Sequence, residues 1–580
     1  MKGNPKPLLS GGYPIQTPIT RLTCSFWLRE TAVELGKYVI LSHRWVLDTE
    51  RVRTLKSNYD YRLGGNSDGA PPIAPEDITK IFQEAAQLTA RLGIKYIWID
   101  SLCIVQDDPE DWKREATKMA SYYANAWLTI AANSTEGLYL LSDFPEVLPD
   151  VIHIPFTDDE GQHAAGISVQ PVFNPRLHDL YTKTVTESQL LSRGWVLQEW
   201  LLSSRIAAFS QNAGVFLVCS EDLPRSALSK VAVEKGQGDA ADKSYKSALD
   251  LSLVVLSDIA KSWRRVVEAY SALNLTNVPS DRLIALSGVA SEFQAAIQGA
   301  LDQSGPADYY SGLWWDEMAR GLQWEPVDRT SRPYARVPGF PSYSWASLGR
   351  LKVDEEGEIT GDIETAAVRW HTQWRRHAER LFKLREVRRV PWAPDRNDGQ
   401  PRLEEAFYLS NEAPKLDFGI ENRFLALGLE ANHLIGTDGA ESSIHYRKIS
   451  TDELYVDEAW HRIHQNDGPS IGWASFDDPD LRVENTNSGP FIAGSNRQRP
   501  IYAFRLSCSR QVPVMLRDYV GKVDINAVLY VAGMETRIVN KVGLDMRCFE
   551  RIGVGRMIES RFANGILEDL VRKRGSFWLV

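Results

Sequence analysis

Hydrophobic and polar positions follow one another in a regular order between residues 37 and 132, and this order predicts an α/β unit. Three β-rich apolar runs alternate with two stretches in which apolar residues recur at helical spacing. A strand–helix–strand–helix–strand order implies right-handed crossovers and a parallel sheet. The predicted elements are strands over 37–45, 95–100 and 127–132 and helices over 75–93 and 109–124.

The pattern changes twice more along the chain. Residues 191–210 predict a turn, a short helix and a strand, whereas the polar residues 225–245 predict a loop. Helical spacing dominates 246–300, and from about residue 331 short strands and turns take over, as in a sandwich or a barrel. We therefore predict an α/β parallel-sheet domain over 1–225, a helical connecting region over 226–330 and a β-rich C-terminal domain over 331–580.

Composition narrows the class of protein. The chain has 580 residues, of which 43% are hydrophobic and 24% charged, as in a globular protein of several domains. Its net charge of −10 argues against a general nucleic-acid binder, because phosphate binding needs a basic surface. No signal peptide and no apolar run of membrane-spanning length is visible, and the cysteines are scattered without a CxxC pair. We expect a cytoplasmic protein with reduced thiols.

Two further polar segments are predicted to form helices. Residues 369–390 carry eight basic and two acidic residues, and an amphipathic helix packed on the β-rich region is favoured over a partner- or phosphate-binding helix. His461 and His464 form an HxxH pair without a third ligand, so a surface helix is favoured over a zinc site. The chain also lacks the P-loop, HExxH and GxSxG motifs, so we predict no metal site and no chemistry of those classes.

A carboxylate on the apolar side of the predicted helix 109–124 is the first candidate for chemistry. On a helical wheel Glu115 falls inside the apolar arc, flanked by Met119 and Tyr122. A carboxylate there must be paired, or its pKa rises through desolvation, and such acids concentrate at functional sites. A structural ion pair explains it equally well. The nearby acids are interpreted as charges that favour a helix start, and they are Asp107, Asp108, Glu110 and Asp111.

Polar residues at the ends of predicted strands form a second set of candidates. Asp100 closes its strand, where ligand sites of open α/β sheets lie, although capping of the following turn is the simpler role. Ser42 and His43 face opposite sides of a strand, so they do not easily form a nucleophile–base pair. Arg44 offers a bidentate contact to a phosphate or a carboxylate.

Three blocks of sequence together carry a family resemblance. They are YVILSHRW at 38–45, WIDSLCIVQDD at 98–108 and RGWVLQE at 193–199, in which Arg193 and Glu199 are predicted to pair with each other or with Asp100. In type, order and spacing these blocks resemble the heterokaryon-incompatibility (HET) domain family of filamentous fungi. The first block departs from the family pattern, because His43 replaces an aromatic residue and Val46 replaces a glycine.

The resemblance implies non-self recognition with programmed cell death, and a TIR-like (flavodoxin-like) parallel-sheet domain. Some TIR domains cleave NAD⁺ with a Glu in a Trp-Cys-x-x-Glu setting, which Trp112 and Glu115 resemble without the Cys. By this analogy Glu115 is the predicted catalytic residue. The residues predicted to bind substrate are Ser42, Arg44, Trp45, Asp100, Trp112, Arg193 and Glu199.

Three functions remain open at this point. The first is a cell-death effector in which the β-rich region regulates or senses. The second is an interaction scaffold without chemistry, and the third is a HET-like enzyme of a secondary-metabolite pathway that acts on a hydrophobic small molecule. We expect no prosthetic group, with NAD⁺ as the candidate substrate. The expected partners are other incompatibility proteins, further copies of this chain or a small molecule, and not nucleic acid.

Overall fold

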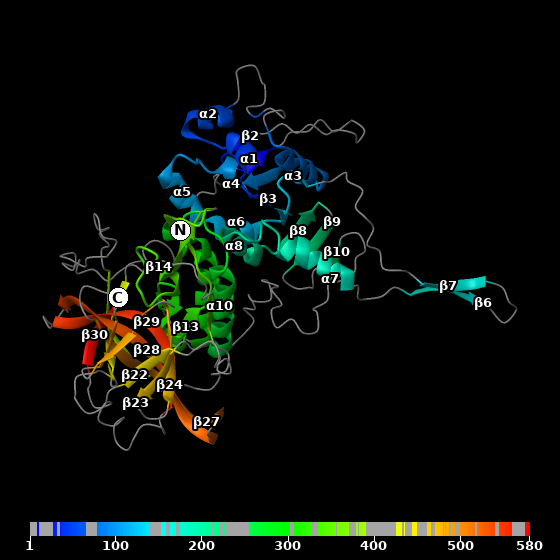
Figure 1. The fold of residues 1–580 in the computed structure, drawn as a ribbon. Helices are drawn as coiled ribbons and strands as arrows, with labels where there is room; N and C mark the ends of the chain where they lie inside the picture. The colour runs from blue at the N-terminus through cyan, green and yellow to red at the C-terminus, as the bar shows by residue number, and fades with distance from the viewer. Residues whose placement is uncertain are drawn as a thin grey trace. The chain divides into compact units, whose positions relative to one another are not determined.

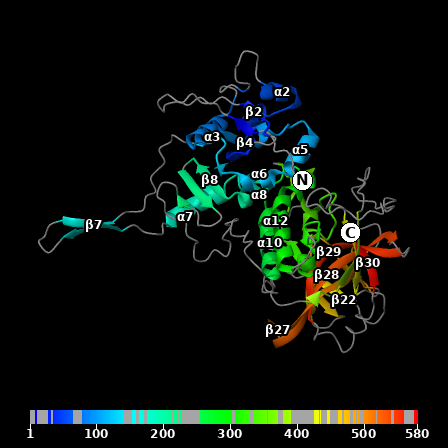
Figure 2. The ribbon, with the colours of Figure 1, turned by 180° about the vertical axis from the view of Figure 1, so that it is seen from behind.

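The computed structural model divides into two compact units, one formed by Met1–Asp250 with Ala285–Val289 and one by Leu251–Ile284 with Ala290–Val580. Figures 1 and 2 show their elements from opposite sides. The predicted boundaries at residues 225 and 330 stay predictions. The structure describes residues 8–10, 27–31, 35–64, 73, 78–138, 152–157, 163–169, 175–211, 214–219, 225–226, 255–301, 307–327, 334–354, 356–370, 379–380, 382–389, 425–431, 434–435, 444–448, 461–465, 470–478, 481, 483–486, 489–492, 499–516, 519–539, 545–558 and 575–580.

A mixed sheet forms the framework of the first unit. Its described strands follow the order β10-β9-β8-β5-β3-β4-β1-β2. The centre is parallel, because β3 pairs in parallel with β4 and β5, and β5 pairs in parallel with β8. These central strands are β3 (Tyr38–Ser42), β4 (Tyr96–Ile99), β5 (Leu128–Ala132) and β8 (Arg205–Ser210). The predicted parallel sheet is therefore confirmed at the centre.

The edges of this sheet are antiparallel, and there the prediction of a parallel sheet is wrong. β1 pairs antiparallel with β2 and β4, and β9 pairs antiparallel with β8 and β10. The edge strands are β1 (Leu8–Ser10), β2 (Trp27–Arg29), β9 (Gly214–Cys219) and β10 (Arg225–Ser226). Only residues 211–213 join β8 to β9, and so short a connection permits antiparallel pairing but no crossover.

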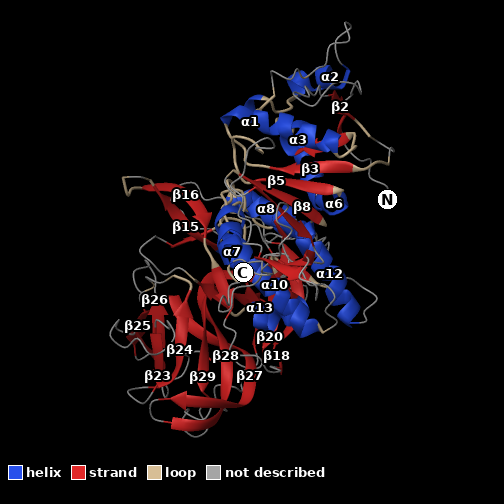
Figure 3. Ribbon diagram, turned by 90° about the vertical axis from the view of Figure 1, so that its right-hand side faces the viewer, coloured by secondary structure: helices blue, strands red, loops and turns tan. Residues whose placement is uncertain are grey.

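Helices cover both faces of the sheet, with α3 on one side and α6 and α8 on the other (Figure 3). The described helices of this unit are α1 (Leu47–Arg51), α2 (Lys56–Gly64), α3 (Lys80–Arg91), α4 (Asp100–Cys103), α5 (Pro109–Ala116), α6 (Met119–Asn125), α7 (Pro175–Tyr181), a π-helix (Thr182–Thr186) and α8 (Gly194–Leu202). Apolar residues of α3 and α6, such as Phe82 and Tyr123, join the strand residues in one buried core.

Two predicted boundaries in this unit are wrong in detail. The helix predicted over 109–124 is broken at Thr117–Lys118 into α5 and α6, so Glu115 lies in the last turn of α5. Asp100 does not close its strand but begins the short helix α4. Between β5 and α7 the chain forms the hairpin of β6 (Ile152–Thr157) and β7 (His163–Val169). Most of the predicted loop 225–245 lies outside the described residues.

The second unit begins with helices and continues with strands, as the sequence predicts. The buried stripe of α10 includes Trp263, Val266, Val267 and Tyr270, at the spacing of one helix face. Its described helices are α10 (Leu256–Ser271), α11 (Val278–Asp281), α12 (Ser287–Leu301), α13 (Met318–Gly321) and three 3₁₀ turns (Ile284–Leu286, Trp315–Glu317 and Trp345–Ser347).

The strands of the second unit form several sheets. The small sheets use β11 (Tyr309–Tyr310), β12 (Leu313–Trp314), β13 (Trp324–Pro326), β14 (Tyr334–Arg336), β15 (Leu348–Val353), β16 (Ile359–Thr365) and β17 (Val368–Trp370). The large, mainly antiparallel sheet uses β18 (Glu379–Arg380), β19 (Phe382–Arg389), β20 (Leu425–Ala431), β21 (Leu434–Ile435), β22 (Ile444–Lys448), β23 (His461–Gln465), β24 (Ser470–Phe476), β25 (Val483–Thr486), β26 (Gly489–Ile492), β27 (Arg499–Leu516), β28 (Tyr519–Val539), β29 (Asp545–Ile558) and β30 (Gly575–Leu579).

Two predicted helices of this region are strands. The basic segment 369–390 contains the end of β17, then β18 and β19, and β19 pairs with β20 from Phe382↔Ala431 to Arg389↔Leu425. His461 and His464 lie in β23, where residues three apart face opposite sides of the sheet. Pairing with neighbouring strands outweighs local helix propensity in both cases, because the sheet satisfies the backbone and buries one face.

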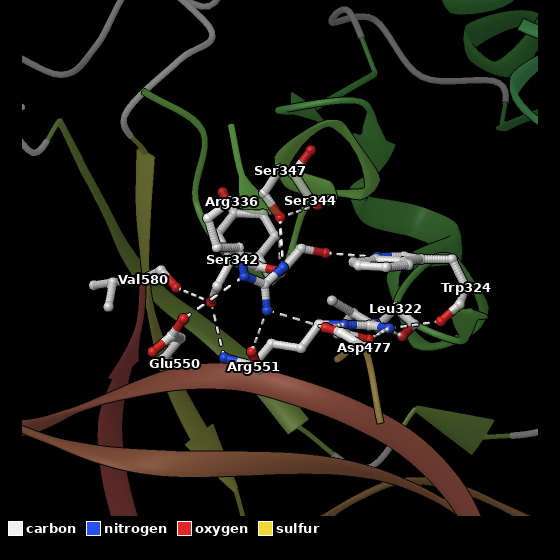
Figure 4. A network of polar contacts seen from close by, with 11 residues as sticks. Leu322, Trp324, Arg336, Ser342, Ser344, Ser347, Asp477, Glu550, Arg551 and Val580 are labelled. Carbon is white, nitrogen blue, oxygen red and sulfur yellow. Dashed lines mark hydrogen bonds and ion pairs between the residues drawn. The ribbon is translucent and has the colours of Figure 1, made fainter. Parts of the chain in front are cut away.

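A buried ionic network ties distant parts of the second unit together (Figure 4). We call Arg336, Ser342, Asp477 and Arg551 the Arg551 network. Arg551 is fully buried and donates to both carboxylate oxygens of Asp477, at 3.0 and 2.9 Å. Its guanidinium lies over the ring of Trp324, 3.4 Å from the centroid. Arg336 donates to Asp477 as well, at 3.1 Å, so one carboxylate serves two cations.

Candidate functional site

Polar side chains from three segments meet at the carboxyl ends of β3 and β4. His43 and Trp45 follow β3, Asp100 follows β4 directly, and α8 supplies Arg193 at its N-cap and Glu199 in its interior. We call these five residues the Asp100 cluster. In open α/β sheets ligands bind at this edge, because the chain leaves every parallel strand there in a loop.

Asp100 is the most accessible carboxylate of this cluster. The indole Nε1 of Trp45 donates to its Oδ2 at 2.8 Å, and the backbone amide of Ser101 donates to its Oδ1 at 2.7 Å. The Asp100 side chain is nevertheless 21% exposed, whereas His43, 3.7 Å away through Nδ1, is fully buried. The carboxylate is thus fixed in orientation and still reachable from solvent. Of the predicted capping contacts the structure shows the one to the Ser101 amide, while the N-cap position of α4 is Ile99.

His43 is a buried imidazole held neutral. Its ring packs edge-on against Phe82 with centroids 5.0 Å apart. Within the described part of the chain neither ring nitrogen has a hydrogen-bond partner. Burial lowers the pKa of His43, Asp100 acts in the opposite direction, and Arg193 lowers the pKa further. Arg193 also donates to the His43 carbonyl at 2.8 Å, which fixes the start of α8 to the end of β3.

Glu199 is a buried acid with an unusual proton affinity. Burial raises the pKa of Glu199 to about 7, against the opposing effects of the Ser42 hydroxyl and the Arg193 guanidinium, and Asp100 adds to the rise. Its Oε2 has no hydrogen-bond partner among the described residues. Burial, together with the neighbouring Glu199 and Asp100, also raises the pKa of Tyr123 far above its ordinary value. A carboxyl group poised near neutrality is what proton transfer requires.

Glu115 is completely buried at the end of α5 and is surrounded by partners of opposite charge. The Tyr122 hydroxyl donates to its Oε2 at 2.7 Å, and Arg114 Nε and Lys118 Nζ lie 3.4 Å from its Oε1. The Arg114 and Lys118 side chains are 49% and 29% exposed, so they separate the carboxylate from solvent. The predicted pairing of Glu115 is confirmed, and its partners are now known.

Two residues of α5 near Glu115 make contacts that the sequence pattern predicts only in part. Trp112 packs edge-on against Trp195 of α8, with centroids 6.1 Å apart. Asp111, interpreted as a helix-start charge, is buried: it accepts the Val105 amide at 2.9 Å and pairs with Arg114. Its predicted place at a helix start is confirmed, since Asp111 lies in the first turn of α5, but its carboxylate is buried because the loop before α5 folds back onto it.

Part of the chain matches a known protein family. Residues 38–199 match the family model described as heterokaryon incompatibility protein (HET). No curated protein and no solved structure matches the chain. The HET match begins at the first residue of β3 and ends at Glu199, so it encloses the central strands β3, β4 and β5 and the whole Asp100 cluster.

Within the HET region the structure brings together most of the residues predicted to bind substrate. Trp45, Asp100, Arg193 and Glu199 belong to the Asp100 cluster, and the Ser42 hydroxyl lies beside Glu199. The remaining two make other described contacts: Arg44 donates to the Gln189 side chain, and Trp112 packs on Trp195. Whether any of these residues binds substrate stays a prediction.

The sequence does not indicate the roles of two buried residues in the HET region, His43 and Tyr123. The signal for His43 is its place inside the block YVILSHRW, beside Ser42 and two residues after the end of the apolar run. For Tyr123 nothing in the sequence shows that its phenol reaches Glu199.

A metal site and a membrane-spanning helix are both missing from the described residues. No group of three or more His, Cys, Asp or Glu side chains in the described ranges is arranged to hold a metal ion. Among the described helices, none combines the length and the apolar composition that crossing a bilayer would take.

Proposed function

We propose that the HET region is the effector of a heterokaryon-incompatibility protein and causes cell death by cleaving NAD⁺. Its action in non-self recognition would involve other incompatibility proteins or self-association. The observation that carries the proposal is the order of the parallel strands, β4-β3-β5-β8, which in chain order is 2-1-3-4. Flavodoxin-like sheets have this order and bind nucleotide ligands at the carboxyl ends of their strands, where the Asp100 cluster lies.

The proposed reaction breaks the bond between nicotinamide and ribose. Water adds to the anomeric carbon as nicotinamide leaves with the bonding electrons, and the products are ADP-ribose, nicotinamide and a proton. The ribose carries positive charge in the transition state, which a fixed carboxylate stabilises. Glu115 would supply that carboxylate once the exposed side chains of Arg114 and Lys118 move aside. Trp112 stands three residues before Glu115, one fewer than in the Trp-Cys-x-x-Glu setting, so the analogy rests on the helix and not on spacing.

The other predicted residues would hold the dinucleotide. Arg44 follows β3 at the point where the strand order reverses between β3 and β5, and its guanidinium suits a pyrophosphate. The accessible carboxylate of Asp100 would accept hydrogen bonds from ribose hydroxyls. Glu199, beside Asp100 and with a pKa of about 7, would take up or release the proton that the reaction produces.

A second candidate function is an interaction scaffold without chemistry. It is favoured by the environment of Glu115, because two cations and a phenol already use both carboxylate oxygens. Such pairing is also how a protein keeps a buried carboxylate for structural reasons.

One assay separates the two functions. The purified full chain is incubated with NAD⁺, with and without forced oligomerisation, and nicotinamide release is followed. We expect release by the wild type and a loss of at least about 100-fold in Glu115→Gln, which keeps the Tyr122 contact but removes the charge. Glu110→Gln, an exposed acid of the same helix, is the matched control and should keep full activity. Absence of release from the wild type in every condition would contradict NAD⁺ cleavage and leave the scaffold.

A further inference from the structure

A buried arginine near the HET motif residues has no counter-charge among the described residues. Arg62 lies in the last turn of α2, and the residue is 8% exposed. Its described partner is the Thr54 hydroxyl, which accepts from Nη1 at 2.7 Å. No carboxylate lies within ion-pair distance of Arg62 in the described part of the chain. A guanidinium has five N–H donors, so most of the donors of Arg62 have no acceptor among the described residues.

The charge on Arg62 is therefore costly to the fold as it stands. Burial alone lowers the pKa of Arg62 to about 10, which still leaves the guanidinium protonated at neutral pH. The C-terminal end of α2 supplies a partial negative charge, but a helix dipole offers only about half a charge. Buried arginines are otherwise paired with anions, because an uncompensated buried charge destabilises a protein strongly.

The surroundings of Arg62 are rigid rather than adaptable. Thr54 is completely buried, its amide donates to the Ser101 carbonyl at 2.9 Å, and its own carbonyl accepts from the Gln106 amide at 2.8 Å. The Thr54 hydroxyl in turn donates to the Leu102 carbonyl at 2.6 Å. The residue that orients Arg62 is thus fixed to the segment that connects Asp100 with α5. A built position of this kind is typical of a binding site.

We propose that Arg62, oriented by Thr54, anchors an oxyanion-binding site that takes a phosphate group, either free phosphate or the phosphate of a nucleotide. A planar guanidinium whose remaining donors have no described acceptor matches such an anion. The site is separate from Arg44, and it stands independently of NAD⁺ cleavage. Because Thr54 is bonded to residues 101–106, a bound anion would stabilise the segment that carries Asp100.

The test measures thermal unfolding of the purified full chain against concentration of inorganic phosphate, with sodium chloride at matched ionic strength. We expect phosphate to raise the wild-type unfolding temperature, because a ligand that binds the folded state stabilises it. Arg62→Met should unfold at the same or a higher temperature without phosphate and lose at least about tenfold in apparent phosphate affinity. Arg53→Met, which removes an exposed arginine of the same segment, is the control and should respond like the wild type.

The test of the Arg62 site measures binding through stability, so its result does not depend on whether the protein cleaves NAD⁺. Stabilisation by ADP-ribose that depends on Arg62 would identify a nucleotide phosphate as ligand, whereas stabilisation by inorganic phosphate alone would identify the free anion. No shift in the wild type, or the same shift in Arg62→Met, would overturn the site. If Arg62→Met does not fold, Arg62→Lys keeps the charge without the fork and should bind phosphate about tenfold more weakly. Unchanged phosphate affinity in Arg62→Lys would also overturn the proposal.

Discussion

The two units of this protein each bury a cluster of charged groups, and the two clusters differ in how many of their polar atoms are hydrogen-bonded. In the Arg551 network both oxygens of Asp477 accept from arginine, and Arg551 donates in addition to the carbonyls of Leu322 and Trp324, at 2.5 and 2.6 Å. The one buried side-chain atom of this network without a described hydrogen bond is Arg336 Nε, which lies 3.6 Å from Glu550 Oε1. In the Asp100 cluster, both ring nitrogens of His43 and one oxygen of Glu199 lack a described hydrogen bond, and His43 Nδ1 lies 3.7 Å from Asp100 Oδ1.

This difference is what the proposed function predicts for a structural cluster and a functional one. An ionic network in which nearly every donor and acceptor is bonded fixes the positions of the strands that supply it and leaves little capacity for a ligand or a proton. A cluster that leaves buried donors and acceptors unused is less stable than the same residues fully bonded. Proteins retain such costs mainly at functional sites. The difference therefore supports the proposal that the chemistry lies in the HET region, and we assign the Arg551 network to stability.

The largest expected effect comes from breaking the Arg551 network. Asp477→Asn removes the charge that Arg336 and Arg551 share, which leaves the fully buried Arg551 without a counter-charge and Arg336 with Glu550 alone. We expect a loss of about 3–5 kcal/mol in the free energy of unfolding of the second unit, measured by denaturant unfolding. Glu550→Gln, at the partly exposed Glu550–Arg336 pair, is the control and should cost about 1 kcal/mol or less. Equal costs for the two variants would contradict the structural role of Asp477.

In the Asp100 cluster we expect a smaller change in the free energy of unfolding, and of opposite sign. The pKa of Glu199 is raised on folding from 4.5 to about 7, so the folded state holds the proton more tightly. Its stabilising contribution is complete below pH 4.5 and is lost as the pH rises through 7. Glu199→Gln should match the wild type near pH 5 and be more stable at pH 8, by up to about 3 kcal/mol.

The matched control for this pH dependence is Glu187→Gln, which removes an exposed acid shortly before α8. Its stability should follow the wild-type pH curve. Unfolding curves of wild type and Glu199→Gln that stay parallel from pH 5 to pH 8 would show that Glu199 titrates normally.

The sequence predicts the framework of the HET region better than its chemistry. Apolar runs and helical spacing locate β3, β4, β5 and α3, because burial on the two sides of a sheet imposes those patterns. They do not locate β1 or β9, whose positions depend on pairing at the edges of the sheet. The same limit explains the basic segment around β19, where pairing with β20 overrides a helical pattern.

The candidate site residues also fall into those that the sequence indicates and those that only the packing reveals. Asp100, Arg193 and Glu199 could be predicted as a group because they occur in two of the three blocks of family-like sequence. The buried state of Asp111 and the arrangement of Tyr123 beside Glu199 depend on how the loop before α5 and helix α6 pack, which no local pattern records. Arg62 is the extreme case, since an isolated arginine in a polar helix normally indicates a solvated residue.

Cell survival after expression of Glu199→Gln tests the central claim most directly. The claim is that the unsatisfied Asp100 cluster is retained for function at a cost in stability. At matched protein levels the wild type should kill the host cells, and Glu199→Gln should leave them alive although the variant is at least as stable at pH 8. Killing by Glu199→Gln at the wild-type rate would contradict the claim, because a more stable protein would then act without the acid.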